Sequence, residues 1–161
     1  MQHDTHPIAP SAPRRTLLRA GIVLALMPVI PAHAATPRVE VWKSPTCGCC
    51  GDWIDHLRAH GFEVTVHDTG NNAARRRFGL PDKLASCHTG LVGGYAVEGH
   101  VPAREIQRLL REKPRALGLA VPGMPIGSPG MDGPAYGNQR DRYDVLLVAV
   151  DGTTRPYQSY P

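Results

Sequence analysis

Apolar and polar residues follow regular intervals in the chain after residue 38, and these intervals predict its first elements. Residues 39–44 alternate between apolar and polar side chains, as a half-buried strand does. Residues 49–60 carry apolar side chains at the spacing of an amphipathic helix. A second alternation over residues 62–67 predicts another strand, and the short basic stretch of residues 71–78 predicts a second helix.

The following residues continue the same kind of pattern and then lose it. Residues 89–101 predict a hairpin that turns at a Gly-Gly pair, and residues 102–112 predict a helix that begins at a proline. Residues 114–137 are so rich in proline and glycine that we expect no regular element there. Residues 143–150 are mostly apolar and predict a buried strand, and we expect a loop from residue 151 to the end.

These elements together predict an α/β fold with a small mixed sheet flanked by helices. Helices are expected on both faces, because each face of the sheet must be buried against another layer. The order strand, helix, strand, helix, hairpin, helix is that of the thioredoxin-like fold, followed here by a Pro/Gly-rich C-terminal loop and an added strand. The length of 161 residues suits one such domain with short extensions.

Residues 1–34 have the pattern of an export signal. An arginine pair precedes an apolar run over residues 21–30, and small residues follow it. The order RRTLLR is typical of a twin-arginine signal, with an ordinary secretory signal as the alternative. The run is far shorter than the ~20 residues that span a bilayer, so we expect no permanent membrane anchor. We therefore expect cleavage near Ala34, a mature domain over residues 35–161, and a periplasmic location.

Charge and motifs exclude several classes of function. The net charge of the whole sequence is +4, and it falls to +2 for residues 35–161 once three arginines and one aspartate are set aside. Nucleic acid binding needs a dense basic stripe, so we expect no nucleic acid partner. The sequence has no HExxH motif, phosphate-binding glycine loop or serine nucleophile elbow. We expect neither a hydrolase nor a transferase, and oxidoreductase activity stays open.

Three of the four cysteines lie together as Cys47-Gly48-Cys49-Cys50, at the predicted start of the first helix. A helix N-terminus favours anions, which lowers thiol pKa values and makes thiolates available. Cys47 and Cys50 have the CxxC spacing of redox enzymes, but the third sulfur of Cys49 offers a soft metal ion another ligand. The fourth cysteine, Cys87, stands beside His88 in the loop before the hairpin, which the expected fold places opposite the first helix.

Each of these sulfur residues also has a structural interpretation. Two structural disulfides are the alternative for an exported domain, but Cys49 and Cys50 are neighbours and only Cys87 lies outside the cluster. Two unstrained disulfides are therefore difficult to form. Met124 and Met131 are the only methionines after the signal segment, and both lie in the Pro/Gly-rich loop. Their thioethers are soft, neutral ligands that suit Cu(I), and packing of the loop onto the core is the alternative.

The remaining histidines and the arginine run give weaker signals. His56 and His60 are four residues apart on the first predicted helix but off its apolar stripe, so we expect them to be solvated. His67 and His100 lie near the ends of predicted elements, where an auxiliary or outer ligand is an option. The three arginines of residues 75–77 are expected to form a solvated helix face.

Four motifs resemble a known family: WKSPTCGCCGDW at 42–53, SCHT at 86–89, EGHVP at 98–102 and VPGMPIGSPGM at 121–131. In this order they resemble the CopG-like family, exported bacterial proteins with a domain of unknown function (DUF411) that are associated with copper resistance. The resemblance implies a thioredoxin-like fold. It also implies copper binding through the CxCC cysteines, with a proposed interconversion of Cu(I) and Cu(II).

The resemblance and the donor chemistry together give these candidate ligands: Cys47, Cys49, Cys50, Cys87, His88, Met124 and Met131. The three CxCC cysteines are carried over from the family motif, and the fourth cysteine is implied as another sulfur ligand. The histidine and the methionines are our inference from their place in the motifs. Thioredoxins have a cis-proline before the strand that faces their cysteine pair, whereas Ser86-Cys87 stands here, a change that favours metal capture over disulfide exchange.

We therefore expect a periplasmic protein of copper resistance or homeostasis that binds one or several Cu(I) ions and possesses a potential redox pair. Zinc is less favoured, because cysteine and histidine serve it equally but the methionine loop favours copper. One alternative is a thiol–disulfide oxidoreductase in which Cys47 attacks and Cys50 resolves. Another is a metallochaperone that passes copper to a different periplasmic copper-handling protein.

Overall fold

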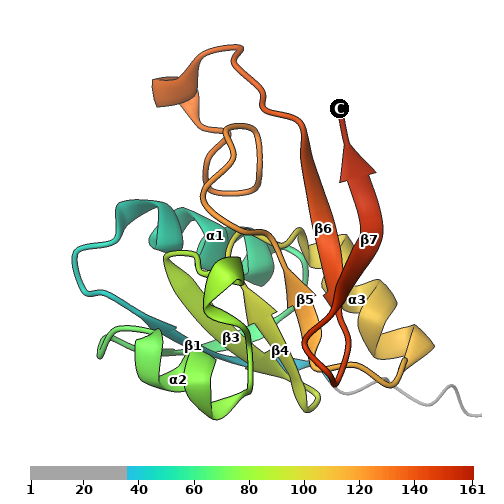
Figure 1. The fold of residues 1–161 in the computed structure, drawn as a ribbon. Helices are drawn as coiled ribbons and strands as arrows, with labels where there is room; N and C mark the ends of the chain where they lie inside the picture. Colours follow the sequence, from blue (N-terminus) through green and yellow to red (C-terminus); the bar gives the residue numbers. More distant parts are fainter. Residues whose placement is uncertain (1–35) are drawn as a thin grey trace, which may run out of the picture. The chain divides into compact units, whose positions relative to one another are not determined.

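A seven-stranded mixed sheet organises the chain, with the strand order β2-β1-β3-β4-β5-β6-β7 (Figure 1). The computed structural model describes residues 36–161. The strands are β1 (Arg38–Lys43), β2 (Glu63–His67), β3 (His88–Val92), β4 (Tyr95–Glu98), β5 (Gly118–Ala120), β6 (Tyr143–Val148) and β7 (Thr154–Tyr160). The helices are α1 (Gly48–Ala59), α2 (Asn72–Arg77) and α3 (Ala103–Glu112), with short 3-10 turns at Asp82–Leu84 and Pro134–Tyr136. The predicted α/β class and the predicted order of elements up to α3 are confirmed.

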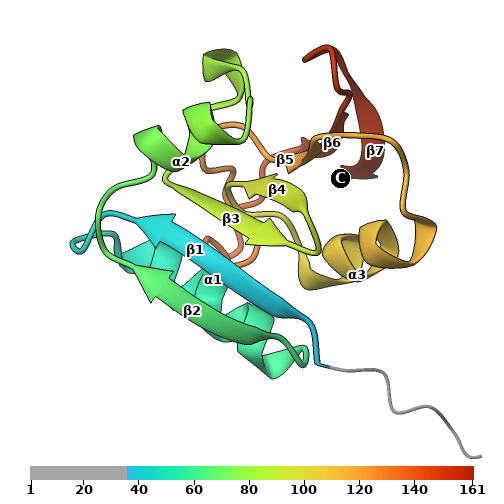
Figure 2. The ribbon, with the colours of Figure 1, turned by 90° about the horizontal axis from the view of Figure 1, so that it is seen from below.

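The main core lies between one face of the sheet and the helices α1 and α3. Helix α1 runs along β1 and β2 (Figure 2) and buries the apolar stripe that its spacing predicts, which includes Trp53 and Leu57. Helix α3 adds Ile106 and Leu109, which are fully buried in the same cluster. Burial of a large apolar side chain stabilises the fold by about 1.5–3 kcal/mol. This core therefore fixes α1 firmly against the strand that leads into it.

A second, smaller apolar cluster covers the other face of the sheet. Leu80 and Leu84, from the segment after α2, pack there against Ala96 of β4, Ala120 of β5 and Val148 of β6. Strand side chains alternate between the two faces, so that these three residues point away from the main core. Both faces are thus covered, as the α/β pattern predicts.

The predicted hairpin is confirmed as the pair β3 and β4. Its turn is Gly93-Gly94, and both residues have positive φ angles, 55° and 85°. Glycine adopts that conformation at little steric cost, and two such residues in succession form the turn that matches the twist of paired strands.

Two expectations for the C-terminal third are wrong. Residues 114–137 contain a strand, β5, whose three residues are buried between β4 and β6. The chain after residue 151 is not a loop, because β7 pairs antiparallel with β6 along its whole length. Its sequence TRPYQSY lacks a clear apolar alternation, and Pro156 stands opposite Leu146 beside an irregularity in the register. Proline is tolerated there because β7 is an edge strand.

The expected export signal, residues 1–34 with cleavage near Ala34, lies outside the described residues. Within residues 36–161, no helix combines the length and the apolar character that crossing a membrane requires. The longest described helix, α1, has 12 residues.

Candidate metal centre

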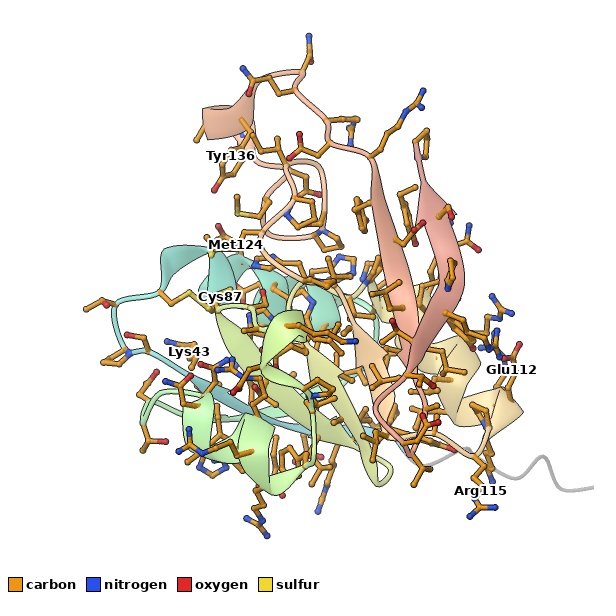
Figure 3. All side chains as sticks on the ribbon, in the orientation of Figure 1. Lys43, Cys87, Glu112, Arg115, Met124 and Tyr136 are labelled. Atoms are coloured by element: carbon orange, nitrogen blue, oxygen red, sulfur yellow. A yellow bond between two sulfur atoms is a disulfide. The ribbon has the colours of Figure 1, made fainter. Side chains whose placement is uncertain are left out.

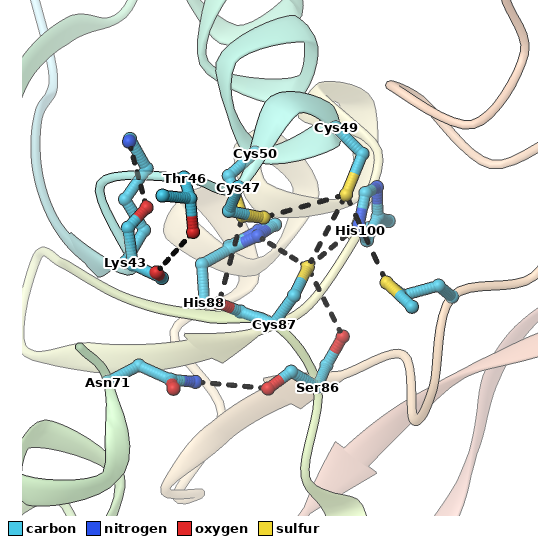
Figure 4. The surroundings of a disulfide bond; sticks show 12 residues. Lys43, Thr46, Cys47, Cys49, Cys50, Asn71, Ser86, Cys87, His88 and His100 are labelled. Atoms are coloured by element: carbon cyan, nitrogen blue, oxygen red, sulfur yellow. Dashed lines mark hydrogen bonds between the residues drawn. A yellow bond between two sulfur atoms is a disulfide. The ribbon is translucent and has the colours of Figure 1, made fainter.

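The four cysteines converge at the start of α1 (Figure 4). Strand β1 leads into the loop that carries Cys47, and β3 is the antiparallel neighbour of β1, with Lys43 opposite His88. The loop before β3 therefore lies at the same end of the sheet as the first turn of α1, and it brings Cys87 there. The four sulfur atoms lie within 4.8 Å of one another. The sheet topology thus assembles the sulfur cluster, defined as Cys47, Cys49, Cys50 and Cys87.

Two of the four cysteines are oxidised in this structure. Cys47 and Cys50 form a disulfide, and Cys49 and Cys87 are free thiols. The Cys49 Sγ lies 3.6 Å from the Cys47 Sγ and 3.9 Å from the Cys87 Sγ. The structure thus contains one disulfide among the described cysteines, not the two structural disulfides of the alternative. A site with four thiolates requires reduction of the Cys47–Cys50 bond.

The N-terminus of α1 provides a favourable environment for thiolates. Cys47 is the N-cap residue, its side chain makes no capping hydrogen bond, and the first turn contains no acidic residue. The unpaired backbone N–H groups and the helix dipole therefore act on the neighbouring sulfur atoms. Cys50 is fully buried, whereas Cys47 and Cys49 are half-buried and reachable from solvent. A thiolate formed there after reduction is stabilised by the helix.

Two histidines contact the sulfur of Cys87. Its Sγ lies 3.3 Å from Nδ1 of His88 and 3.1 Å from Nε2 of His100. Both imidazoles are fully buried. Nδ1 of His100 lies 2.8 Å from the carbonyl oxygen of Pro129, so this nitrogen donates a proton and Nε2 presents a lone pair towards Cys87. This is the arrangement in which a second contact orients a metal-binding histidine.

His100 was expected only as an auxiliary or outer ligand, whereas the structure places it in direct contact with Cys87. The available signal was its position in the EGHVP motif, which has no ligand spacing of its own. His67 lies elsewhere, with Nε2 at 3.2 Å from Glu40 and its ring stacked on Trp42. Of the two auxiliary candidates, His100 alone joins a potential metal-binding group in the described chain.

Burial decides the protonation of these groups. Burial, followed by the neighbouring His100, lowers the pKa of His88 to about 3, while the backbone of Gly99 acts in the opposite direction. Burial also lowers the pKa of His100. Burial, and then the nearby Cys49, raises the pKa of Cys87 to about 12. Without a metal ion, both histidines are neutral at pH 7 and offer lone pairs, and Cys87 is a thiol that must release its proton to become a ligand.

His88 carries an unsatisfied nitrogen atom. Its Nε2 is buried and has no hydrogen-bond partner among the described residues. The ring packs against Trp53 at a centroid distance of 4.1 Å, and the Trp53 indole N–H donates to the carbonyl of Val101. An unpaired buried polar atom is costly and rare in folded proteins. Because Nδ1 is the ring nitrogen that faces Cys87, the unpaired Nε2 points away from that sulfur.

The two methionines of the Pro/Gly-rich loop lie in different environments. Met124 is 50% exposed, and its Sδ lies 4.0 Å from the Cys49 Sγ. Figure 3 shows Met124 near Cys87. Met131 is only 8% exposed, and its Sδ accepts a hydrogen bond from the hydroxyl of Tyr136 at 3.2 Å. The structure therefore brings Met124 to the sulfur cluster and packs Met131 within its own loop.

Two residues that were expected to be solvated have structural contacts instead. His56 is half-buried, and its Nε2 accepts the backbone N–H of Ala103 at 3.1 Å, which caps the start of α3. Arg75 is 8% exposed and donates to the fully buried carboxylate of Glu98 at 3.2 Å. Helix α2 lies against the sheet, so the first arginine of its run points inward. His60 and the other two arginines of the run are exposed, as expected.

The donor atoms gathered here are chemically soft. They comprise four cysteine sulfurs, one thioether and two neutral imidazoles, arranged as two potential metal-binding groups that share Cys87. Thiolate and thioether ligands favour Cu(I), whereas hard cations favour oxygen ligands, and no carboxylate belongs to either group. Zinc also accepts cysteine and histidine, but the thioether distinguishes the set from an ordinary zinc site.

Comparisons with known proteins give a family match and two structural relatives. Residues 84–131 match a family described as "Protein of unknown function, DUF411", and this segment contains Cys87, both site histidines and both loop methionines. No curated protein was found to match the chain. The solved structure "Copper resistance protein copG- Form 1" is 45% identical, has a TM-score of 0.71, and the match covers 77% of this chain and 97% of that chain. The corresponding "Form 2" is 44% identical with a TM-score of 0.71, and its match covers 78% of this chain and 98% of that chain.

Proposed function

The chain belongs to the family of CopG-like copper resistance proteins, and from this premise we propose that it binds copper through the sulfur cluster at the start of α1. The observation that carries the proposal is the convergence of four cysteine sulfurs within 4.8 Å of one another. Copper is the cargo or substrate of this site. The four-cysteine group, and the group that Cys87 forms with two histidines, match the preference of Cu(I) for soft ligands.

We assign Cys87 the central place among the ligands. It belongs both to the four-cysteine group and to the group that it forms with His88 and His100. A thiolate bridges soft metal ions readily, so a shared thiolate supports more than one Cu(I) ion in adjacent positions. Met124 adds a thioether on the solvent side, where the Cys49 Sγ is 4.0 Å away.

The disulfide supports a redox role in addition to binding. Two thiols that join as the Cys47–Cys50 disulfide release two electrons and two protons. These two electrons reduce two Cu(II) ions to two Cu(I) ions, and an external dithiol returns the disulfide to thiols. Oxidation also removes two of the four thiolates, so the oxidised protein should hold fewer Cu(I) ions. Interconversion of Cu(I) and Cu(II) thus uses atoms that are already adjacent in the site.

We infer that this activity takes place outside the cytoplasm. The export pattern of residues 1–34 and the disulfide both agree with an oxidising compartment, with residues 35–161 as the mature domain. Bound Cu(I) would protect thiolates there from forming further disulfides. Periplasmic expression followed by N-terminal sequencing tests this inference, with a mature N-terminus near Ala35 as the expected result.

The decisive experiment for copper binding is a Cu(I) titration of the reduced protein against a competing chelator. Cys49 is the most informative position, because Cys49→Ser leaves the Cys47–Cys50 pair intact. We expect this variant to bind fewer Cu(I) ions or to bind them more weakly than the reduced native protein. The oxidised native protein serves as the matched control, with lower capacity and an unchanged sequence. Equal stoichiometry and affinity in the reduced native protein and Cys49→Ser would reject the proposal.

A thiol–disulfide oxidoreductase is the second candidate, and the disulfide itself favours it. Cys47 is reachable from solvent and Cys50 is fully buried, as attacking and resolving cysteines are in such enzymes. Against this role, the free thiol of Cys49 lies 3.6 Å from the Cys47 sulfur and competes with any substrate. Reduction of insulin and a mixed disulfide trapped by Cys50→Ser would support it. Failure of both experiments would exclude it.

A further inference from the structure

Met124 reaches the sulfur cluster from an exposed loop, where its side chain has little packing to hold it. It is 50% exposed, and yet its Sδ lies 4.0 Å from the Cys49 Sγ. A methionine side chain has three freely rotating bonds, and ordering them costs conformational entropy. The position of Met124 therefore depends on how firmly the backbone beside it is held.

Ser86 holds that backbone. Its hydroxyl donates a hydrogen bond to the carbonyl oxygen of Gly123, and the N–H of Gly123 donates to the carbonyl oxygen of Ala85 at 3.2 Å. These two hydrogen bonds join the residues that precede Cys87 to the residue that precedes Met124. The Cys87 Sγ is 4.0 Å from the same hydroxyl. The Gly123 oxygen is closer, so the hydroxyl donates its hydrogen bond to that oxygen.

The backbone of Ser86 is itself held from the sheet side. Its N–H donates to the Glu98 Oε1 at 2.8 Å. Its carbonyl accepts a hydrogen bond from the Asn71 side-chain amide at 3.1 Å (Figure 4). Glu98 is fully buried, and its second carboxylate oxygen accepts the Thr89 hydroxyl at 2.6 Å. Every polar atom of Ser86 is thus paired, two with residues under α2 and one with the methionine loop.

Gly99 leaves the space that this arrangement needs. A Cβ atom at Gly99 would lie 2.6 Å from the Ser86 Oγ and would also collide with the carbonyl oxygen of Val121. Its φ angle of +71° is a further reason for glycine at this position. The loops that carry Cys87, His100 and Met124 can approach one another closely because this residue has no side chain.

We propose that Ser86 is a positioning residue that keeps the Met124 thioether beside the cysteine sulfurs by joining the two loops. The functional meaning of this role rests on the proposed copper binding, whereas the contacts themselves exist without copper. Loss of the hydroxyl removes one of the two hydrogen bonds that hold the backbone at Gly123. It leaves Cys87 in place, because the hydrogen bonds from the Ser86 backbone to Glu98 and Asn71 remain.

The first test uses metal-free protein. Ser86→Ala removes one hydroxyl and keeps the backbone bonds, and the matched control is Ser44→Ala, whose hydroxyl contacts that of Thr46 at the other side of the site. Amide hydrogen exchange over residues 121–126 should be about fivefold faster in Ser86→Ala, the effect of one net hydrogen bond, and unchanged in Ser44→Ala. Equal exchange rates in Ser86→Ala and the native protein would overturn the positioning role.

The second test is a double-mutant cycle on Cu(I) affinity. Ser86→Ala and Met124→Leu should each weaken Cu(I) binding by about fivefold, the effect of about one lost contact. The double variant should bind no more weakly than Met124→Leu alone, because the hydroxyl acts through this methionine. Additive losses would overturn the role of Ser86. If the reduced native protein binds no Cu(I), the proposed function fails, and the exchange experiment still decides whether Ser86 positions the loop.

Discussion

The sulfur cluster at the start of α1 and the polar cluster beneath α2 differ in the contacts that hold their atoms together. In the polar cluster, which we define as Glu98, Thr89, Arg75 and Asn71, each carboxylate oxygen of the buried glutamate accepts hydrogen bonds. In the sulfur cluster, the Cys49 Sγ lies 3.6 to 4.0 Å from the sulfur atoms of Cys47, Cys87 and Met124. Each region also has one buried nitrogen without a hydrogen-bond partner among the described residues, Nε of Arg75 and Nε2 of His88.

This difference distinguishes a cluster that stabilises the fold from a cluster that binds a ligand. The buried carboxylate of Glu98 is complete without a ligand, because short hydrogen bonds satisfy both of its oxygen atoms, and loss of its charge leaves Arg75 without its buried partner. The sulfur atoms make only long contacts with one another, so they gain favourable contacts when a soft ion binds. The two clusters meet at Ser86, which contacts Glu98 on one side and the methionine loop on the other. Variants in each cluster should therefore change different measured quantities.

The largest effect on stability is expected in the paired cluster, for Glu98→Gln. This change leaves Arg75 buried without its charged partner. The other carboxylate near Arg75 belongs to Asp82, which lies 3.6 Å away and has a side chain that is 84% exposed. We expect a loss of about 3 kcal/mol in the free energy of unfolding, measured by urea titration of the metal-free protein. Asp82→Asn is the control and should change it by less than about 0.5 kcal/mol. Native stability in Glu98→Gln would contradict the structural role of this cluster.

Cys87→Ser should have the opposite effect, with a large change in Cu(I) affinity and a small change in stability. Because both donor groups contain Cys87, we expect the affinity for Cu(I) to fall by about 100-fold, at the upper end of what a lost site contact costs. The free energy of unfolding of the metal-free protein should change by less than about 1 kcal/mol, since the serine hydroxyl replaces the thiol as a donor towards the His88 and His100 nitrogens. A destabilised protein with native Cu(I) affinity would remove the distinction between the two clusters.

The two loop methionines provide a matched pair with a smaller effect. Met124→Leu should weaken Cu(I) binding about fivefold, because the thioether lies beside the Cys49 sulfur. Met131→Leu should leave the Cu(I) affinity unchanged and change stability by less than about 1.5 kcal/mol, since a similar volume is kept in a packed position. Chelator competition and thermal unfolding of both variants measure the two quantities. Equal losses of affinity would show that the loop, and not the Met124 sulfur, matters.

The smallest effect is expected for His56, a half-buried histidine. Its Nε2 accepts a hydrogen bond from the backbone N–H of Ala103. Burial and the nearby His60 lower its pKa, and Asp132 opposes them, so the unfolded chain binds a proton more tightly than the folded protein does. Its contribution to stability is therefore complete above the ordinary histidine pKa of about 6.5 and is lost as the pH falls below it. His56→Gln should reduce the loss of stability between pH 7.5 and 5.5, measured by urea midpoints. An identical pH dependence in the native protein and the variant would contradict this assignment.

The parts of the fold that could be predicted are those set by local patterns. The apolar stripe around Trp53 and the turn at Gly93-Gly94 follow from helical spacing and from turn chemistry. Strand β7 was missed because an edge strand with Pro156 carries little alternation, and β5 because three residues give no period. The position of β5 depends on its neighbours β4 and β6, and not on its own sequence.

The candidate site also has contacts that could be predicted from the sequence and contacts that could not. The meeting of Cys87 with the CxCC cysteines could be expected once the topology was assumed, because the antiparallel strand β3 begins beside the end of β1. The contact of His100 with Cys87 could not be expected, since it depends on a hydrogen bond that His100 donates to the carbonyl oxygen of Pro129 in a distant loop. The Cys47–Cys50 disulfide was one of several possibilities for four cysteines, and sequence spacing alone does not choose among them.

X-ray absorption at the copper edge of the reduced, copper-loaded protein tests the central claim most directly, because it reports the metal's oxidation state and its ligand atoms together. We predict Cu(I) with a first shell made mainly of sulfur and a smaller contribution from imidazole nitrogen. A shell of oxygen and nitrogen without sulfur, or a reduced protein that retains no copper for the measurement, would contradict it.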